Sequence, residues 1–459
     1  MKTWSKKKPL TRCVCRSGQD AVERSFSLIS MLNVFEPMPD TLDLAERGRL
    51  GINHFTLIQD QNCTYRMLIT IQGQLENRGK ESTLSFHDFC QEQLTEPTRA
   101  QLKTTPMTDT HTAYTPDELL KSIEKLPRFP LAHLPTPLEY LPRFSEALGG
   151  PHVWIKRDDC TGLAFGGNKA RHNEFLIADA LQQGANTVVW GAGVQSNNCR
   201  QTAAACAKAG LACHLVLGRG KAADGPNPVQ GNLLLDHLVG ASIEIVDQAE
   251  GPEVTAKIAQ AADRLRGQGF QVYEQDPQHV KPLAALSYVA ATIELLEQTA
   301  KAGITPDALY VCSAGATGAG IRLATAALGH TFLVQHITPI VWPWDTQATM
   351  TQIANDAAQR LGITTRLEKS DIHVTEEYVG EGYGIPTEGC LEAITLLART
   401  EGIFVDPSYS GKSLAGLIDH IRSSHFTSNQ NVVFIHTGGT PALFAYNEQL
   451  ASDIERRSL

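Results

Sequence analysis

Lys169 is the residue whose type and position best suit it for chemistry. It ends the motif GGNK, which runs from Gly166 to Lys169 directly before a predicted helix. The two glycines let the backbone approach a ligand closely, and the amine that follows them can reach into a cleft. A lysine after a glycine turn is also a common solvated surface residue, so this motif alone leaves both interpretations open.

A second motif, GAGVQSNN at Gly191 to Asn198, lies where a predicted strand ends and a helix begins. This position places Ser196 and Asn197 at the start of the helix, where the unpaired amides of the first turn point outward. Such amides bind carboxylates and phosphates without needing a basic side chain. The alternative is that Ser196 only caps the helix.

The motif SAGATGAG at Ser313 to Gly320 repeats this geometry later in the chain. Its glycines and Thr317 can form a nest for phosphate oxygens. GATGAG also resembles a dinucleotide-binding turn, but that interpretation requires an acidic residue at the end of the next strand. The predicted strand carries His336 near its end. The phosphate nest is therefore the preferred interpretation.

A third strand-to-helix junction is HTGGTPALFAY at His436 to Tyr446, with Thr437, Gly438 and Gly439 at the turn. Three such junctions meet at one crevice if their strands are parallel, because ligands bind at the carboxyl ends of parallel strands. One nest for an anion together with one reactive lysine suggests a phosphorylated aldehyde cofactor.

Short β-branched runs alternate with amphipathic runs and glycine turns from residue 153 onward. The predicted strands cover residues 153–157, 187–190, 213–218, 242–246, 271–273, 308–312, 332–337 and 431–436. The predicted helices cover residues 173–183, 196–209, 232–238, 254–267, 284–301, 320–328, 346–361, 387–401 and 411–423. This alternation predicts parallel βαβ units. Two sets of units predict two open α/β domains with a ligand in the crevice between them.

Composition excludes several classes of protein. The chain has 459 residues, of which 42% are hydrophobic and 19% charged, and its net charge is −9. These values are typical of a folded globular protein rather than of a disordered chain or a nucleic-acid binder. The chain contains no run of 18 apolar residues, so no transmembrane helix is predicted. We therefore expect neither a nucleic acid nor a membrane as a partner.

The ten cysteines form no regular disulfide framework, and the chain has no CxxC pair and no HExxH motif. A reducing cytoplasm is therefore the expected location. Cys199, Cys206 and Cys213 recur every seven residues. We interpret Cys199 and Cys206 as small residues on one helix face, because metal sites use more closely spaced ligand pairs. No metal site is predicted.

Residues 1–112 carry weak periodicity and are predicted to be an extension of unknown role. A threonine-rich run from Thr104 to Thr115 is typical of a linker. Thr115 is the expected N-cap of the first helix, with Pro116 at its first position and Glu118 as the capping-box acid. We expect the compact enzyme to begin near Met107, so that residues 107–459 fold and act without the preceding segment.

Five motifs in order resemble one enzyme family. They are IKRDD with TGLAFGGNKAR, GVQSNNCRQTAAA, EGYGIPTEGCLEAI, DPSYSGKSLAGLIDHIR and HTGGTPALFAY. Together they look like the D-cysteine desulfhydrase and 1-aminocyclopropane-1-carboxylate deaminase family of fold type II, tryptophan synthase β-like pyridoxal-phosphate enzymes. The resemblance covers about residues 113–450. It implies a large cofactor-binding domain made of residues 113–171 and 281–459, a small α/β domain of residues 172–280, and a homodimer.

The resemblance also implies roles for single residues. Lys169 would bind pyridoxal phosphate covalently, Asn197 would contact its ring hydroxyl, and Ser196 would lie near the carboxylate of a small amino-acid substrate. The implied phosphate-binding turn comprises Gly315, Ala316, Thr317, Gly318 and Gly320. Residues implied to face the substrate or the rest of the cofactor are Gln195, Asn198, Tyr383, Tyr409, Ser410 and Thr437.

Ser410 favours one branch of this family. In the deaminases its position holds a glutamate that keeps the pyridine nitrogen protonated, and the position of Thr437 holds a leucine. A charged partner strengthens the ring as an electron sink, which cleavage of a cyclopropane bond needs. A hydroxyl suffices for loss of an α-proton and departure of a good leaving group. The expected reaction is thus β-elimination of D-cysteine to pyruvate, ammonia and hydrogen sulfide, with Lys169 as general base.

Two departures from the family pattern affect this expectation. The desulfhydrases commonly carry histidine where this chain has Asn198, and a Gly-Gly pair where it has Gly315 and Ala316. The first bears on the choice of substrate. The alternatives that stay open are 1-aminocyclopropane-1-carboxylate deaminase, a lyase that expels sulfite from L-cysteate, and a non-catalytic binding or regulatory protein that has kept the fold.

Overall fold

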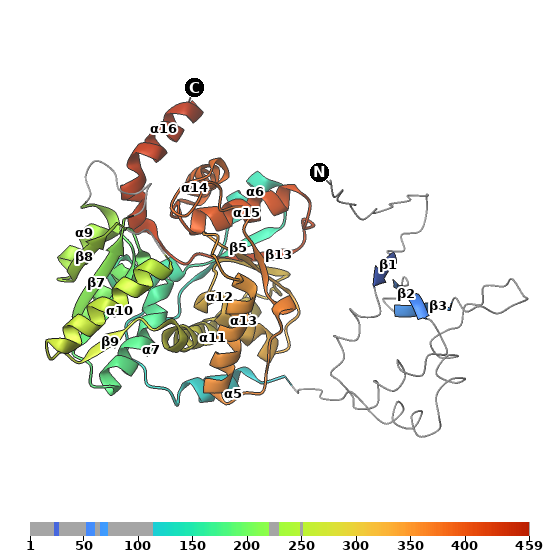
Figure 1. The fold of residues 1–459 in the computed structure, drawn as a ribbon. Coiled ribbons are helices and arrows are strands. Elements are labelled where there is room, and N and C mark those ends of the chain that lie inside the picture. Colours follow the sequence, from blue (N-terminus) through green and yellow to red (C-terminus); the bar gives the residue numbers. More distant parts are fainter. Residues whose placement is uncertain are drawn as a thin grey trace, which may run out of the picture. The chain divides into compact units, whose positions relative to one another are not determined.

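The computed structural model describes residues 113–219, 229–247 and 251–458, together with three strands nearer the N-terminus (Figure 1). The chain divides into two compact units, Met1–Thr110 and His111–Leu459. The second unit holds the predicted motifs. The expected start of the enzyme near Met107 lies outside the described residues and stays a prediction.

The first unit contains one antiparallel sheet in the order β1-β2-β3. Its strands are β1 (Glu23–Phe26), β2 (Ile52–Gln59) and β3 (Tyr65–Ile71). The other residues of the predicted extension, including most of the threonine-rich run, lie outside the described residues.

The second unit alternates strands and helices, as the sequence predicts. Its strands are β4 (Leu138–Tyr140), β5 (His152–Lys156), β6 (Thr187–Gly193), β7 (Ala212–Gly218), β8 (Ser242–Val246), β9 (Val272–Glu274), β10 (Ala308–Cys312), β11 (Leu333–Ile337), β12 (His373–Thr375) and β13 (Asn431–Ile435). Its α-helices are α5 (Pro116–Ile123), α6 (Pro142–Leu148), α7 (Asn168–Gln182), α8 (Asn197–Ala209), α9 (Gly231–Leu238), α10 (Pro252–Gly267), α11 (Pro277–Lys301), α12 (Ala316–Ala327), α13 (Thr346–Leu361), α14 (Glu388–Glu401), α15 (Ser410–Arg422) and α16 (Asn447–Ser458).

The larger sheet of this unit has six strands in the order β12-β11-β10-β13-β5-β4. All neighbours are parallel except β4, which runs antiparallel to β5. Side chains alternate between its two faces. Ala308 and Tyr310 of β10 pack with helices α6, α14 and α15, whereas Leu309 and Val311 pack with α11 and α12. Because both faces are covered by helices, β10 is apolar throughout.

The smaller sheet has four parallel strands in the order β8-β7-β6-β9. Val189 of β6 packs with α10 on one face, and Val188 and Trp190 pack with the cluster of α7 and α8 on the other. The two parallel sheets confirm the predicted α/β class. The domain boundaries drawn from the sequence at residues 172 and 280 stay a prediction.

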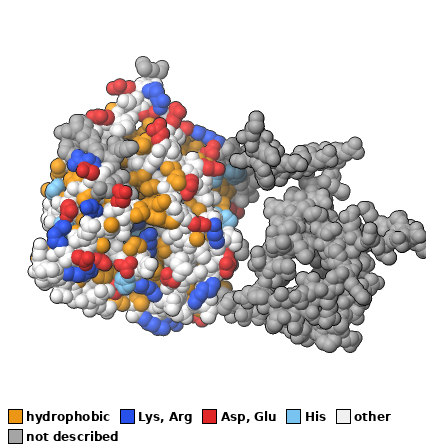
Figure 2. Space-filling view, in the orientation of Figure 1, with side chains coloured by type: hydrophobic (Ala, Val, Ile, Leu, Met, Phe, Trp, Pro, Cys, Tyr) orange, Lys and Arg blue, Asp and Glu red, His pale blue; other side chains and the backbone are white. Residues whose placement is uncertain are grey.

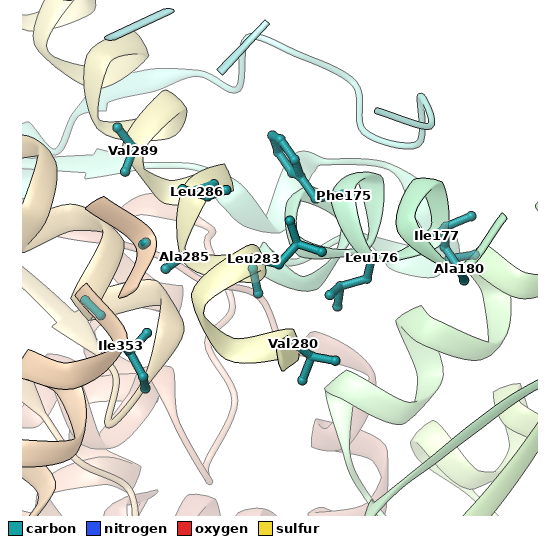
Figure 3. Close-up of a cluster of buried hydrophobic side chains, with 14 of the residues drawn as sticks. Phe175, Leu176, Ile177, Ala180, Val280, Leu283, Ala285, Leu286, Val289 and Ile353 are labelled. Atoms are coloured by element: carbon teal, nitrogen blue, oxygen red, sulfur yellow. The ribbon is translucent and has the colours of Figure 1, made fainter. Parts of the chain in front are cut away.

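Helices α7, α11 and α13 form the interior next to the predicted site (Figure 3). Phe175 and Leu176 of α7 lie across from Leu283 and Leu286 of α11, and Ile353 of α13 lies on the other side of α11. These side chains are almost fully buried. Burial of a leucine or phenylalanine stabilises the fold by about 1.5–3 kcal/mol, so this cluster fixes α7, which carries Lys169.

The start of the first helix follows its sequence signature. Thr115 is the N-cap of α5, its hydroxyl accepts from the Glu118 amide, and the Glu118 carboxylate accepts from the Thr115 amide at 2.8 Å. Pro116 occupies the first helical position. The predicted capping box is confirmed, because its hydrogen bonds are local and need no distant partner.

Three helices begin four or more residues earlier than the sequence predicts. Helix α7 begins at Asn168 rather than at residue 173, α11 at Pro277 rather than at 284, and α12 at Ala316 rather than at 320. Pro282 lies inside α11 and glycines lie inside α12. Both residue types disfavour helix interiors, and here tertiary packing overrides that local preference.

The surface of the second unit is mixed in character. Figure 2 shows hydrophobic side chains gathered near the middle of the visible face, with charged side chains of both signs scattered around them. Among the described residues, no helix is both long enough and apolar enough to cross a membrane.

Candidate active site

A cavity of about 340 Å³ lies at the carboxyl ends of β6 and β10 and beside the turn that follows β13. The predicted site residues in its wall are Lys169, Ser196, Asn197, Asn198, Gly315, Ala316, Thr317, Tyr409 and Thr437. They come from segments up to 268 residues apart in the chain (from 169 to 437). The parallel strands bring them together, because their carboxyl ends meet at one edge of each sheet.

Lys169 lies in the first turn of α7 and lines the cavity. Burial lowers the pKa of its amine from 10.5 to about 8, because the charged form loses its hydration. The turn before it needs glycine. Gly166 has φ +70°, and a Cβ there would lie 1.8 Å from the carbonyl oxygen of Asp159. The glycine at this position therefore allows the backbone to approach another segment of the protein closely, whereas the sequence analysis expected a close approach to a ligand.

The glycine turn is fastened to neighbouring segments by its own backbone. The Gly167 amide donates to Thr161 Oγ1 at 2.8 Å, and the Thr161 hydroxyl donates to the Gly167 carbonyl at 2.9 Å. The Asn168 amide donates to the Thr437 carbonyl at 2.9 Å. The GGNK turn is therefore docked on the turn after β13, and Lys169 has a fixed starting point.

The start of α8 forms a second part of the wall. Ser196 is the N-cap and its hydroxyl accepts from the Cys199 amide at 3.2 Å. The side chain therefore caps the helix, as the simpler interpretation states, and it also lines the cavity. Asn197 Oδ1 accepts from Asn232 Nδ2 at 2.8 Å, which fixes the orientation of the Asn197 amide group.

Arg200, near the start of α8, contacts the glycine turn that precedes Lys169. It is fully buried and donates to the carbonyl oxygens of Ala164 and Gly166. Ala164 and Phe165 have φ of +46° and +69°, which is unusual for residues with a side chain. The guanidinium thus stabilises a backbone shape that places Lys169 opposite the start of α8.

The start of α12 is the third part of the wall. Gly315 is its N-cap, so the amides of the first turn have no partner within the helix. The Thr317 hydroxyl lies 2.9 Å from Asn168 Nδ2 and 3.1 Å from His172 Nε2. Burial and the nearby Lys169 hold the pKa of His172 well below its ordinary value, so the imidazole is neutral. This end of α12 has the free amides that the sequence-predicted anion site requires, and binding of an anion here stays a prediction.

The predicted phosphate turn extends to Gly320, and the structure places this residue inside α12, where its amide belongs to the helix. A Cβ at Gly320 would lie 2.2 Å from the Ala285 carbonyl oxygen, so this glycine allows α11 and α12 to approach. Gly318 is also helical, and its amide donates to Ser313 Oγ at 2.9 Å. Neither lines the cavity, whereas Gly315, Ala316 and Thr317 do.

Gln195, which the resemblance implies to face the substrate or cofactor, is hydrogen-bonded to the segment that leads into α9. Its amide nitrogen donates to the Gln230 carbonyl at 3.0 Å and its oxygen accepts from the Asn232 amide at 2.9 Å. The side chain therefore holds the start of α9 and is not part of the cavity wall. The sequence gives no sign of this contact, because α9 follows 36 residues later (from 195 to 231).

Tyr383 and Tyr409 form a pair. Their hydroxyl groups are hydrogen-bonded and their rings meet edge to face with centroids 5.7 Å apart. Tyr409 lines the cavity, and Tyr383 is not among the described residues of the wall. The predicted tyrosines are thus together, but only one of them borders the cavity.

Ser410 is not among the described residues of the cavity wall, but it contacts that wall through Gly438. Its hydroxyl donates to the Gly438 carbonyl at 3.0 Å, and its amide donates to Asp406 Oδ1 at 2.8 Å. Asp406 also accepts from the amides of Ser408 and Tyr409, and burial raises its pKa. The Asp406 carboxylate is therefore hydrogen-bonded to the backbone that leads into α15.

The described wall also contains residues that were not among the predicted site residues, four of which carry a charge or an aromatic ring of interest. His172 lies one helical turn after Lys169. Residues three apart share a helix face, so its place beside Lys169 was predictable from the sequence. Lys281 of α11 and the tryptophans Trp342 and Trp344 after β11 also line the cavity. No motif marks them, because only the packing of α11 and the loop before α13 brings them to the site.

The residues of the cavity fit a phosphorylated aldehyde. Lys169 supplies an amine of lowered pKa, and the start of α12 supplies amides for the phosphate. A Cβ built on Gly315 would meet no atom within 4 Å, so there is open space at this helix end. Among the described residues, no group of three or more histidine, cysteine or acidic side chains could hold a metal ion.

Comparison with known proteins agrees with this chemistry. Residues 130–438 match the family described as pyridoxal-phosphate dependent enzyme. D-cysteine desulfhydrase of Salmonella choleraesuis (strain SC-B67) is 37% identical over 329 residues, which are 72% of this chain and 98% of that protein. 1-Aminocyclopropane-1-carboxylate deaminase of Burkholderia ambifaria (strain MC40-6) is 39% identical over 334 residues, 71% of this chain and 98% of that protein.

A solved structure described as the ACC deaminase homologue superposes with a TM-score of 0.66 at 32% identity, covering 73% of this chain and 98% of that one. The likeness confirms the predicted fold type II architecture, and these relatives are enzymes rather than non-catalytic proteins. The chain therefore belongs to the pyridoxal-phosphate dependent enzymes, as a lyase of the group that includes D-cysteine desulfhydrases and 1-aminocyclopropane-1-carboxylate deaminases, with pyridoxal phosphate as its cofactor.

Proposed function

We propose that this lyase eliminates sulfide from D-cysteine, giving pyruvate, ammonia and hydrogen sulfide with the uptake of one water. The observation that carries the proposal is the character of the cavity wall. Its described residues include no carboxylate, and the residue that the resemblance makes the ring-nitrogen partner is Ser410, whose hydroxyl contacts the Gly438 carbonyl of the wall. A hydroxyl leaves the cofactor a weaker electron sink, which suits departure of a thiol better than cleavage of a carbon–carbon bond.

When bound, pyridoxal phosphate supplies an electron sink for the charge that develops at the substrate α-carbon. Ser196 and the first amides of α8 bind and orient the substrate carboxylate. The Asn197 amide group, fixed by Asn232, would donate to the ring hydroxyl of the cofactor, as the family resemblance implies. These contacts bring the α-proton to the amine of Lys169.

Lys169 acts as the general base. Its pKa of about 8 keeps a useful share of the amine neutral near pH 7–8, so that it can take the α-proton. The bond between the β-carbon and sulfur then breaks with its electron pair on sulfur. Tyr409, oriented by its hydrogen bond with Tyr383, supplies a proton to the departing sulfide. The unsaturated amine left behind reacts with water to give pyruvate and ammonia.

A substrate panel tests the proposal. The purified protein is given D-cysteine, L-cysteate, β-chloro-D-alanine, D-serine and 1-aminocyclopropane-1-carboxylate, and sulfide, sulfite, 2-oxo acid and ammonia are measured. We expect sulfide and pyruvate in equal amounts from D-cysteine. Consumption of the cyclopropane amino acid without release of sulfide from D-cysteine would overturn the assignment.

A lysine variant ties the activity to this cavity. Lys169→Ala should remove an absorbance band in the range of roughly 410–430 nm and reduce pyruvate formation by about 10²–10⁴-fold. Lys208→Ala is the matched control, because Lys208 is an exposed lysine near the end of α8.

The deaminase activity is the second candidate, supported by the relative from Burkholderia ambifaria that bears that name. Ammonia and 2-oxobutyrate from the cyclopropane amino acid would support it. Asn198 borders the cavity beside Ser196 and is the residue that we expect to influence this choice. Sulfite release from L-cysteate would identify the third possibility, with the same elimination and another leaving group.

The assembly and the location are further parts of the proposal. The family resemblance favours a homodimer, which light scattering of the purified full chain measures directly. The cysteine usage favours a reducing cytoplasm, and fractionation of cells that express the protein tests this.

A further inference from the structure

Lys281 is the one cation of the described cavity wall besides Lys169. It lies in the second turn of α11, is half-buried, and makes no hydrogen bond or ion pair with the described residues. Its ammonium lies 6.0 Å from the ring centre of Trp344, which stacks on Trp342 at 4.6 Å. Such a cation beside an aromatic face is held in place without being neutralised.

The packing of two helices shows where Lys281 lies along the cavity. Gly320 of α12 meets Ala285 of α11. The N-terminal turns of both helices border the cavity, with Ala284 on α11 and Ala316 on α12 in its wall. Both helices therefore run away from the cavity in the same sense. One turn back from the Gly320–Ala285 contact, the helical period leads to Lys281 on α11 and to Ala316, the first residue of α12, so we expect these two residues to be neighbours.

The charges of the cavity are unbalanced as they stand. Its described wall contains Lys169 and Lys281, the neutral His172, and no acidic side chain. Lys169 would be engaged by the aldehyde of the cofactor. A phosphate group carries nearly two negative charges at neutral pH, and the amides of α12 supply only about half a positive charge.

We propose that Lys281 is the cation that binds the phosphate of pyridoxal phosphate, and that Trp344 keeps its ammonium directed at the start of α12. The inference concerns the cofactor that the family requires, and it holds whichever amino acid is the substrate. Burial lowers the pKa of Lys281 in the absence of an anion. A phosphate oxygen beside it restores the charged form.

A second negative group on the substrate is the competing occupant. The substrate carboxylate already has the start of α8, on the smaller sheet, as its partner. Lys281 borders the other helix start, so the phosphate is the nearer anion. An L-cysteate sulfonate that reached Lys281 would make the effect of this lysine depend on the substrate and not on the cofactor.

The test compares two cofactor forms that differ only in the phosphate. Full-length protein is freed of cofactor and titrated with pyridoxal phosphate or with pyridoxal, and the absorbance of the lysine adduct gives each dissociation constant. Lys281→Met keeps the aliphatic stem and removes the charge. The expected result is an affinity for pyridoxal phosphate that falls by about 10- to 100-fold, with the affinity for pyridoxal unchanged.

Two further variants make the result specific. Lys281→Arg keeps the charge and should retain most of the affinity, and Lys301→Met removes an exposed lysine at the far end of the same helix. The ³¹P resonance of the bound cofactor is a second readout, and it should respond to Lys281→Met but not to Lys301→Met. Unchanged pyridoxal binding shows that the variant cavity is intact.

An unchanged affinity of Lys281→Met for pyridoxal phosphate would overturn the proposal, as would an equal loss for both cofactor forms. A raised KM for L-cysteate alone, with cofactor affinity intact, would assign Lys281 to the substrate instead. Failure of D-cysteine as a substrate does not affect any of these binding measurements.

Discussion

Asn168 Nδ2 donates a hydrogen bond to the hydroxyl of Thr317 at 2.9 Å. Asn168 immediately precedes Lys169, and Thr317 lies in the first turn of the helix proposed to bind the phosphate. This bond joins residues 149 positions apart and is buried. It sets the separation between the amine and the anion site, which must match the distance between the aldehyde and the phosphate of one cofactor.

Disruption of this bond should weaken cofactor binding. Asn168→Ala and Thr317→Val are each expected to lower the affinity for pyridoxal phosphate, and the double variant should lose less than the sum. The expected coupling is about 0.5–1.5 kcal/mol, because the bond is buried and either variant already breaks it. Titration of the four proteins gives the coupling, and strictly additive losses would contradict a direct link.

As the pH rises, the free energy of unfolding of the cofactor-free protein should increase relative to that of a variant without Lys169. Lys169 titrates at about 8 when folded, against an ordinary 10.5. Between these values the unfolded chain binds a proton that the folded chain has released, so stability rises with pH. The cost of burying the charge is fully present below pH 8, is relieved by pH 10.5 and amounts to at most about 3 kcal/mol.

The measurement is urea unfolding of cofactor-free wild-type protein and of Lys169→Met from pH 7 to pH 10.5. The variant should be the more stable protein at pH 7, and the difference should shrink through the window above pH 8. A difference that stays constant with pH would show that Lys169 is solvated in the folded state.

Two glycines of the SAGATGAG motif should respond differently to an added methyl group. Gly320→Ala places a Cβ 2.2 Å from the Ala285 carbonyl oxygen and should destabilise the protein by about 1–3 kcal/mol, despite the better helix propensity of alanine. Gly315→Ala meets no protein atom within 4 Å and has an extended backbone. It should retain stability but weaken cofactor binding, because its methyl group points into open space at the start of α12.

Thermal unfolding of the apo forms and cofactor titration separate the two effects. Equal loss of stability in both variants would show that Gly315 is also needed for packing.

The tyrosine pair should act as a unit. Tyr409→Phe is expected to lower kcat by about 10- to 100-fold as it removes a proton donor, with a smaller loss for Tyr383→Phe, which acts through Tyr409. In the double variant the losses should not add, because the two hydroxyl groups are hydrogen-bonded to each other. Steady-state kinetics with the best substrate of the panel supply kcat and KM, and independent, additive losses would place the two tyrosines in separate roles.

Local sequence patterns predicted much of what determines single elements. The capping box of Thr115 and Glu118, the N-cap of Ser196 and the strand over residues 308–312 are all observed. Each depends on contacts within a few residues or on alternation along one strand. The cofactor class also followed, because a lysine turn and an anion nest are both local motifs.

The sequence by itself determined that a reactive lysine and helix starts able to bind anions lie at strand ends. Tertiary structure decided which groups remain available to a ligand. Gly320 allows α12 to pack closely against α11, and the Gln195 side chain is hydrogen-bonded at the start of α9. The same packing brought Lys281 to the cavity from a segment with no motif. The physical reason is that hydrogen-bond partners and helix contacts across more than 30 residues depend on strand order and helix crossing, which no local pattern encodes.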